Sequence, residues 1–122
     1  MTLPTDSAAR KRFPLASGLL DYFPDALAEV ANVSRVGNEK HNPGEPLHHA
    51  RGKSMDHADC IMRHLMQRGE FDEVECVNPE TGEKTVYRVR HSACLVWRAL
   101  ALLQMELEAA GAPMARGARA AE

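Results

Sequence analysis

Two pairs of oxygen-bearing side chains are the residues of this chain whose types and spacing best suit chemistry. Glu29 and Asn32 form an E-x-x-N pair, and Asp56 and Asp59 form a D-x-x-D pair. At this spacing on a helix, two side chains lie one above the other on the same face. Oxygen ligands without a thiol suit a hard divalent cation, Mg²⁺ or Mn²⁺, which commonly binds a few carboxylates, water and the phosphate oxygens of a substrate. The four side chains are therefore a candidate metal site.

In an alternative interpretation, the acids are simply solvated on helix surfaces. The position of both pairs beside an apolar stripe argues against this alternative. On the second helix the stripe consists of Met55, Ala58, Ile61, Met62, Leu65 and Met66. A carboxylate at the border of a buried stripe loses hydration, which is costly unless a cation or hydrogen-bond donors replace the water. Spacing alone leaves both interpretations open, and the border position favours the metal.

The connection between the two pairs, residues 37–53, is a second candidate for function. It is rich in glycine, proline and asparagine, and compact domains seldom keep so long a connection without a use. Lysine and arginine side chains could meet phosphates, while asparagine and histidine offer directional hydrogen bonds to a base or sugar. The candidate substrate contacts in this segment are Asn38, Lys40, His41, Asn42, His48, His49, Arg51 and Lys53.

Several other residues carry alternatives. His57, Cys60 and His64 have a spacing that could supply zinc ligands from one helix face, but a single face rarely closes a tetrahedral site and no fourth ligand is evident. His91 could face a ligand from the start of the last helix, or serve as a structural residue at the helix end. Trp97 could stack on a base, although such a residue is more often part of a core.

Three helices and a hairpin must position these residues. Apolar periodicity and turn residues predict helices over residues 24–36, 54–68 and 91–110, each followed by a glycine: Gly37, Gly69 and Gly111. Pro24 suits the first position of its helix, and Ser54 suits the N-cap of the next. β-Branched and aromatic residues around a turn at residues 78–82 predict a hairpin with one wet face over residues 74–89.

The last predicted helix is apolar around most of its circumference, so it needs more than one partner surface. We expect it to be both the third helix of a bundle and part of a subunit interface. The expected fold is mainly α, an oligomeric bundle (dimer or tetramer) with a small β-hairpin insertion.

The predicted domain organisation is one domain over residues 19–111 with a tail at each end. Residues 1–18 form the N-terminal tail, which is expected to lie across the domain through Phe13, Pro14 and Leu15. Residues 112–122, rich in alanine, arginine and glycine, are expected to be disordered.

Composition restricts the class of partner. The chain has 122 residues, with Lys+Arg 15 and Asp+Glu 17 and a formal net charge of −2, so no global positive field draws it to nucleic acid or membrane. No apolar run approaches the roughly 20 residues of a spanning helix, and no signal-peptide core is present near the start. Cys60, Cys76 and Cys94 are odd in number and not closely paired, which fits a reducing compartment. We therefore expect a cytoplasmic protein.

The two pairs resemble a variant of the MazG-type signature of the all-α nucleoside triphosphate pyrophosphohydrolases, Glu-x-x-Glu followed by Glu-x-x-Asp. More closely, the chain resembles the phage-associated dATP/dGTP diphosphohydrolases, which include the MazZ-type enzymes of phages that replace adenine with 2-aminoadenine. This resemblance covers roughly residues 13–108. Four segments carry it: LDYFPDAL at 20–27, GNEKHNPGEPL at 37–47, DHADCIMRHL at 56–65 and RHSACLVWRAL at 90–100.

The resemblance implies a MazG-like bundle that uses Mg²⁺ or Mn²⁺ to cleave a purine (d)NTP between the α and β phosphates, giving the (d)NMP and pyrophosphate. The expected substrate is dGTP, in phage purine metabolism and hence in the host cytoplasm. By position, Glu29, Asp56 and Asp59 match the family's metal carboxylates. Asn32 departs from the usual glutamate and offers only a neutral carbonyl oxygen.

Roles follow for the remaining candidates. Glu29 or Asp56 takes the proton of the attacking water, and these two stay alternatives. Lys40 and Arg63 are the candidates for stabilising charge, Arg63 as a forked donor and Lys40 as a point charge. The further expected substrate contacts are Asn38, His41, Asn42, Lys53 and His91.

Two alternative functions come from other classes. A catalytically inactive nucleotide-binding sensor would keep the fold and the connecting segment but have lost a metal ligand at Asn32. A structural helical oligomer would leave all the acids solvated. Nucleotide binding without turnover would indicate the sensor, and indifference to divalent ions would indicate the structural protein.

Overall fold

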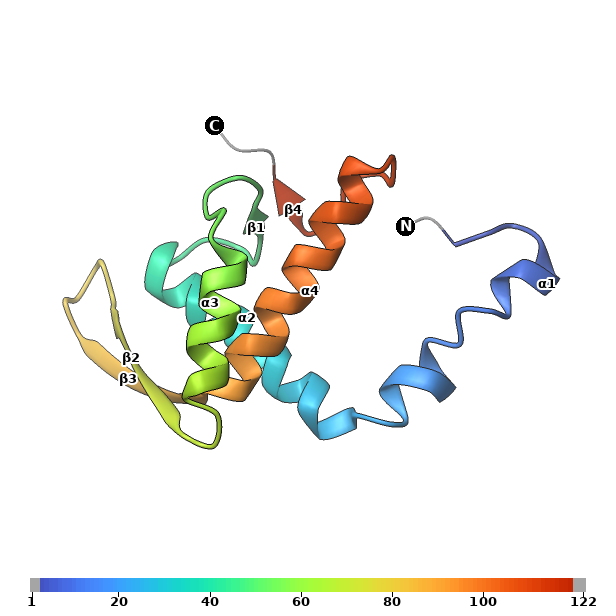
Figure 1. Cartoon of the computed structure of the whole chain (residues 1–122). Coiled ribbons are helices and arrows are strands. Elements are labelled where there is room, and N and C mark those ends of the chain that lie inside the picture. Colours follow the sequence, from blue (N-terminus) through green and yellow to red (C-terminus); the bar gives the residue numbers. More distant parts are fainter. Residues whose placement is uncertain (1–2, 120–122) are drawn as a thin grey trace.

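The structure, a computed structural model, describes residues 3–119, and within these residues three helices and a hairpin make up the body of the molecule (Figure 1). The helices are α2 (Pro24–His41), α3 (His57–Met66) and α4 (His91–Ala109). The antiparallel hairpin pairs β2 (Phe71–Val77) with β3 (Lys84–Arg90). The structure thus shows a partly helical chain with a small two-stranded hairpin, which is consistent with the expected mainly α class.

Several element boundaries differ from the predicted ones, including the hairpin, which begins at Phe71 and ends at Arg90. Helix α2 runs through Gly37 to His41, because the backbone hydrogen bonds continue as far as the Asn42 N–H, which donates to the Asn38 carbonyl. Helix α3 begins after Asp56, and Ser54 is not its N-cap: the Ser54 hydroxyl donates to the Asp56 carboxylate at 2.6 Å. Helix α3 ends at Met66, two residues before its predicted end, whereas α4 ends at Ala109, just before Gly111 as predicted.

The hairpin contributes to the core and is not a loose insertion. The Asn78 side chain fixes its turn by accepting from the backbone N–H of Glu80 at 2.9 Å. Alternate residues of β2 face inward, so one face is wet as predicted. Its Cys76 and the Val89 of β3 pack with Val36 of α2 in the buried cluster.

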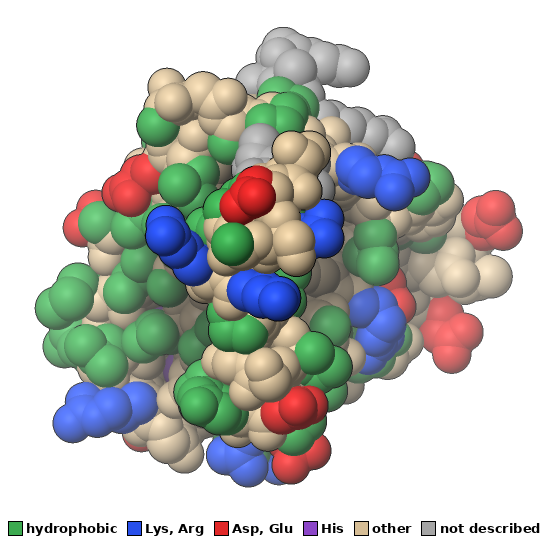
Figure 2. Space-filling model, turned by 90° about the vertical axis from the view of Figure 1, so that its right-hand side faces the viewer, with side chains coloured by type: hydrophobic (Ala, Val, Ile, Leu, Met, Phe, Trp, Pro, Cys, Tyr) green, Lys and Arg blue, Asp and Glu red, His purple; other side chains and the backbone are tan. Residues whose placement is uncertain are grey.

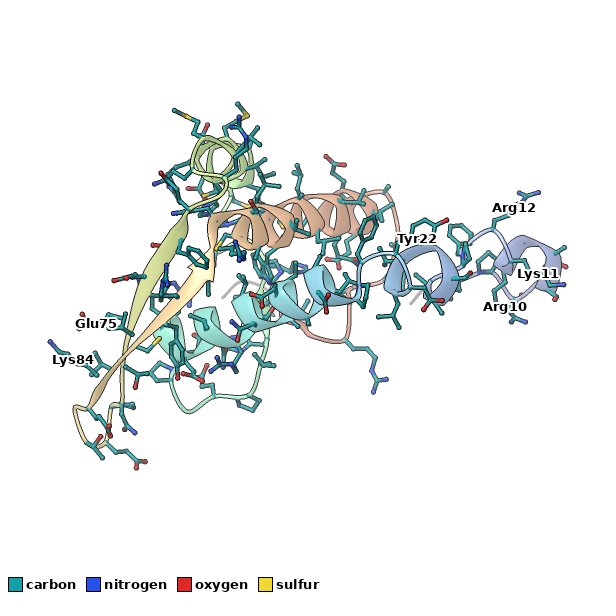
Figure 3. All side chains as sticks on the ribbon, turned by 90° about the horizontal axis from the view of Figure 1, so that it is seen from below. Arg10, Lys11, Arg12, Tyr22, Glu75 and Lys84 are labelled. Carbon is teal, nitrogen blue, oxygen red and sulfur yellow. The ribbon has the colours of Figure 1, made fainter. Side chains whose placement is uncertain are left out.

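Helix α4 lies between the other two helices (Figure 3), and both α2 and α3 pack against it. The Trp97 indole N–H on α4 donates to the Ser34 hydroxyl on α2 at 2.7 Å. Helix α4 therefore separates α2 from α3, so the two helices that carry the candidate metal ligands do not pack directly on each other. Neither a MazG-like bundle nor an oligomer follows from this single chain.

Helix α3 buries the face opposite to the predicted one. His57, Cys60 and His64 are buried, whereas Met62 and Met66 of the apolar stripe are exposed, Met66 by 80%. The buried histidines have hydrogen-bonding partners on α4, which offsets the cost of removing them from water. The apolar stripe of α3 is left on the surface.

The tails also differ from expectation. The N-terminal segment contains α1 (Ser7–Arg10) and the π-helical turn η1 (Ala16–Leu20), and it leads away from the bundle (Figure 1), with Phe13 and Leu15 exposed. Near the other end, β4 (Ala118–Arg119) pairs in parallel with β1 (His49–Ala50). Residues 1–2 and 120–122 of the predicted tails lie outside the described residues.

Candidate functional site

The predicted acidic ligands are exposed, but they lie on separate helices. Glu29 and Asn32 are on α2, whereas Asp56 precedes α3 and Asp59 is in its first turn. In residues 3–119 no three His, Cys, Asp or Glu side chains lie close enough to hold a metal ion. The physical reason is the position of α4 between α2 and α3. The four-residue ligand set stays a prediction.

Asn32 already has a partner. Its side-chain oxygen accepts from the Arg35 guanidinium at 3.2 Å from Nε and 2.9 Å from Nη2, and Arg35 in turn pairs with Glu39 at 2.9 Å. A neutral amide oxygen held by a guanidinium is a poor ligand for a hard cation, which prefers anionic oxygens. Of the two pairs, the Asp56–Asp59 pair is therefore the better one for an ion.

Arg98 of α4 organises the start of α3. Its Nη1 donates to the Ser54 hydroxyl at 2.9 Å, lies 3.2 Å from the His57 Nδ1 and 3.8 Å from the Asp56 carboxylate. The Ser54 hydrogen bond, followed by backbone and other contacts, lowers the pKa of Asp56. Asp56 is thus held as an anion at the N-terminus of a helix, where the unpaired N–H groups favour negative charge.

Little in the sequence indicates this role for Arg98. It shares a helical stripe with His91 and Cys94, but nothing local shows that it reaches Ser54 across 44 positions of sequence. His57, beside it, is buried and its Nε2 has no hydrogen-bond partner among the described residues. Burial lowers the pKa of His57, and the Arg98 charge acts in the same direction, so the ring is kept neutral.

The end of the connecting segment is pinned to α4. Arg51, only 9% exposed, donates through Nε and Nη2 to the two carboxylate oxygens of Glu108, both at 2.8 Å. These bonds, led by the Arg51 contact, lower the pKa of Glu108 to about 2. Arg51 is therefore engaged inside the protein and is not a free phosphate contact. The ring of His49 packs edge-on against Trp97, with centroids 5.0 Å apart, so Trp97 is a packing residue here.

The first part of the connecting segment divides into residues that hold it and residues that face solvent. The Asn38 amide donates to the Glu45 carbonyl at 2.8 Å, and the Asn42 amide approaches the Asn38 oxygen at 3.5 Å. These two asparagines shape the turn after α2. The predicted cationic and histidine contacts Lys40, His41 and Lys53 are exposed.

Arg63 and His91 lie in different surroundings. Arg63 is exposed on α3, where its guanidinium approaches the Cys60 sulfur at 3.8 Å. His91 is buried, and its Nδ1 lies 2.9 Å from the Nδ1 of the buried His64. This placement favours the structural interpretation of His91. His57, Cys60 and His64 do not form a zinc site in the part of the chain that the structure describes.

A hollow of about 430 Å³ lies between the hairpin and the end of α2, a region to which the sequence assigned no role. Its walls include Glu39, Pro43, Asn78, Glu83 and Tyr87. The Arg35 guanidinium stacks over the Tyr87 ring, 4.7 Å from its centroid. The volume is within the range of small-molecule sites, about 300 to 1,000 Å³, and the acidic wall would favour a ligand with hydrogen-bond donors.

The class of protein follows from comparison with known families. Residues 4–114 match the sequence model of the family described as dATP/dGTP diphosphohydrolase, N-terminal. The chain belongs to this family, which confirms the resemblance seen in its sequence. No curated protein and no solved structure matches it. Within the described residues, no helix is both long and apolar enough to cross a membrane.

Proposed function

We propose that this chain is a Mg²⁺- or Mn²⁺-dependent pyrophosphohydrolase that cleaves dGTP between its α and β phosphates to dGMP and pyrophosphate. Membership of the dATP/dGTP diphosphohydrolase family over residues 4–114 carries the proposal. The exposed anion pair Asp56 and Asp59 at the start of α3 supports it, since Mg²⁺ is commonly held by one or two carboxylates together with water and substrate phosphates.

Each residue has a proposed task. Asp56 and Asp59 hold the ion. Glu29, which lies across α4 from them within this single chain, stays the predicted third carboxylate, and Asn32 is at most a neutral contributor. The ion, when bound, neutralises the triphosphate and lowers the pKa of the attacking water. Glu29 or Asp56 accepts the proton of that water. Lys40 and Arg63, both exposed, offset the phosphate charge.

The substrate contacts divide between the connecting segment and the helices. Lys53 and His41 are exposed and free to approach a nucleotide, while Asn38 and Asn42 would present their remaining hydrogen-bonding groups. The proposed assembly is a dimer or tetramer. The proposed setting is purine metabolism of a phage that uses 2-aminoadenine, in the host cytoplasm, where dGMP feeds synthesis of the replacement base.

The test is incubation with dGTP, dATP, dCTP and dTTP, with and without Mg²⁺ or Mn²⁺, and chromatographic identification of products. Metal-dependent dGMP and pyrophosphate are expected. Release of dGDP and orthophosphate would mean that another bond is cut and would contradict the proposal. Asp59→Asn should abolish turnover, whereas Glu73→Gln, the same change at an exposed site on β2, should not.

The Asn32–Arg35 contact favours one other candidate, a nucleotide sensor without turnover. In that case nucleotide binds and no product forms under any metal condition. Asn32→Glu separates the two functions. If the departure at Asn32 is a lost ligand, the glutamate raises metal affinity and turnover; if Asn32 belongs to a tuned site, both fall.

A further inference from the structure

The chain exposes far more surface than a folded monomer of its mass. Its accessible surface is 8882 Å², whereas a folded protein of 13.5 kDa is expected to expose about 6,500 Å², an excess of about 2,400 Å². The buried apolar residues of the described chain are few and small: Val30, Val36, Cys60, Cys76, Val89, Ala93 and Ala101. Leucines, phenylalanines and most methionines are left outside that core.

One uncovered apolar surface is the N-terminal arm, residues 13–23. Its exposed members are Phe13, Leu15, Leu19, Leu20, Tyr22 and Phe23, with Tyr22 70% exposed. Figure 3 shows the arm continuing outward from α2, with Tyr22 near the joint and the basic side chains Arg10, Lys11 and Arg12 at the far end. So many aromatic and leucine side chains on one short segment are typical of a surface that meets a partner.

Two backbone hydrogen bonds hold the arm in line with α2. The Phe23 N–H donates to the Leu19 carbonyl at 3.0 Å, and the Leu27 N–H donates to the Phe23 carbonyl at 2.9 Å. These two bonds bridge η1 and α2, so the arm is held as an extension of the helix. Its apolar side chains therefore point to a partner beyond this chain.

The other uncovered surface is the outer face of α3 and α4. On α4, Val96, Leu100, Leu103 and Leu107 are exposed at spacings of four, three and four residues, which places them on one stripe. Met62, Leu65 and Met66 of α3 are exposed as well. Figure 2 shows hydrophobic side chains gathered over the left-hand side of that view. The stripe on α4 is about 16 Å long at 1.5 Å per residue.

We propose that the arm of one copy packs on the α3–α4 face of a second copy, and that the second arm returns the contact. Each of two copies has an excess of about 2,400 Å² of accessible surface. The sum over the two copies falls in the range of an obligate interface, which buries about 2,000 to 5,000 Å² in total. Charge agrees with this pairing. Arg10, Lys11 and Arg12 precede the apolar arm, and the exposed Glu106 lies near the end of the α4 stripe, where the helix dipole is also negative.

Charge exchange tests this arrangement. Leu20→Lys in the arm and Leu103→Glu on α4 should each convert the dimer to monomer in analytical ultracentrifugation, raising its dissociation constant at least about 100-fold. Mixing the two variants should restore dimers, because one contact then pairs lysine with glutamate and the other is unaltered. Val86→Glu, an exposed apolar site on the hairpin outside both surfaces, should leave the dimer intact.

A measurement on the unaltered chain tests the same arrangement even if the variants fail to fold. ¹⁵N-labelled and unlabelled chains are mixed, treated with a carbodiimide, and searched for a Lys11–Glu106 cross-link carrying one label. A mixed-label cross-link supports the exchange of arms. A monomeric wild type, a cross-link confined to single chains, or variants that stay monomeric when mixed would overturn it. None of these readouts depends on nucleotide turnover, so they are independent of the proposed catalysis.

Discussion

The hydrogen bond between Trp97 and Ser34 is expected to carry a measurable part of the α2–α4 contact. Ser34→Ala removes the oxygen that lies 2.7 Å from the indole nitrogen and changes nothing else at that position. The half-buried Trp97 N–H then has no acceptor there, while its ring still packs on His49. The substitution therefore isolates one polar contact between two helices.

Its magnitude follows from two opposed contributions. Leaving a buried donor unsatisfied costs about 1 to 3 kcal/mol, and because Trp97 is only partly buried we take the lower part, about 1.5 kcal/mol. Alanine is a better helix former than serine by about 0.5 kcal/mol, which offsets part of the loss. The net destabilisation is about 1 kcal/mol, or about 4 °C in Tm for a chain of this size.

The assay is thermal unfolding followed by the fluorescence of Trp97, the one tryptophan of the chain. Ser92→Ala, the same change at an exposed position of α4, is the matched control and should be neutral or slightly stabilising. A Ser34→Ala protein with the Tm of this control and an unchanged emission maximum would refute the reasoning, since the hydrogen bond would then contribute nothing.

Three other predictions concern acid and the core. Burial lowers the pKa of His49, His57 and His64 below 6.5 in the folded protein. As the pH falls, the unfolded chain therefore binds protons at these histidines before the folded chain does. The free energy of unfolding, measured by urea titration, should be full above pH 6.5 and decrease below it. The Glu108 carboxylate stabilises the folded state above its usual pKa of 4.5 and loses this effect as pH falls through about 2, so the deficit of Glu108→Gln should shrink below pH 4.5. Val36→Ala, in the buried cluster with Cys76 and Val89, should cost about 2 kcal/mol in urea unfolding, against less than about 0.5 kcal/mol for the exposed Val86→Ala.

Local signals in the sequence predicted the elements well. Pro24 begins α2, and Gly69 and Gly111 follow the ends of α3 and α4 with φ of 84° and 113°, a conformation that glycine adopts without strain. The prediction that α2 ends at Gly37 is wrong, because a glycine can also continue a helix at a modest cost. No local feature distinguishes those two cases.

Which face of α3 is buried could not be read from the sequence. The helix carries an apolar face and a histidine–cysteine face, and general patterning selects the apolar one. The single chain instead buries His57 and His64 because Arg98 and His91 of α4 provide their partners. These partners are far away in sequence, as is Glu108, which lies 57 positions from Arg51. The candidate acids were found from spacing, whereas the residues that fix their surroundings were not.

Strand β3 continues directly into α4, so the hairpin is attached to the start of that helix. Strand β3 ends at Arg90 and α4 begins at His91, so no flexible linker separates them. Because the chain continues from β3 into α4, we expect a rotation of α4 to displace the hairpin, whose turn residue Asn78 lines the hollow beside α2. A spectroscopic label on the exposed Glu80 of that turn would therefore report movement of α4 without touching the helix.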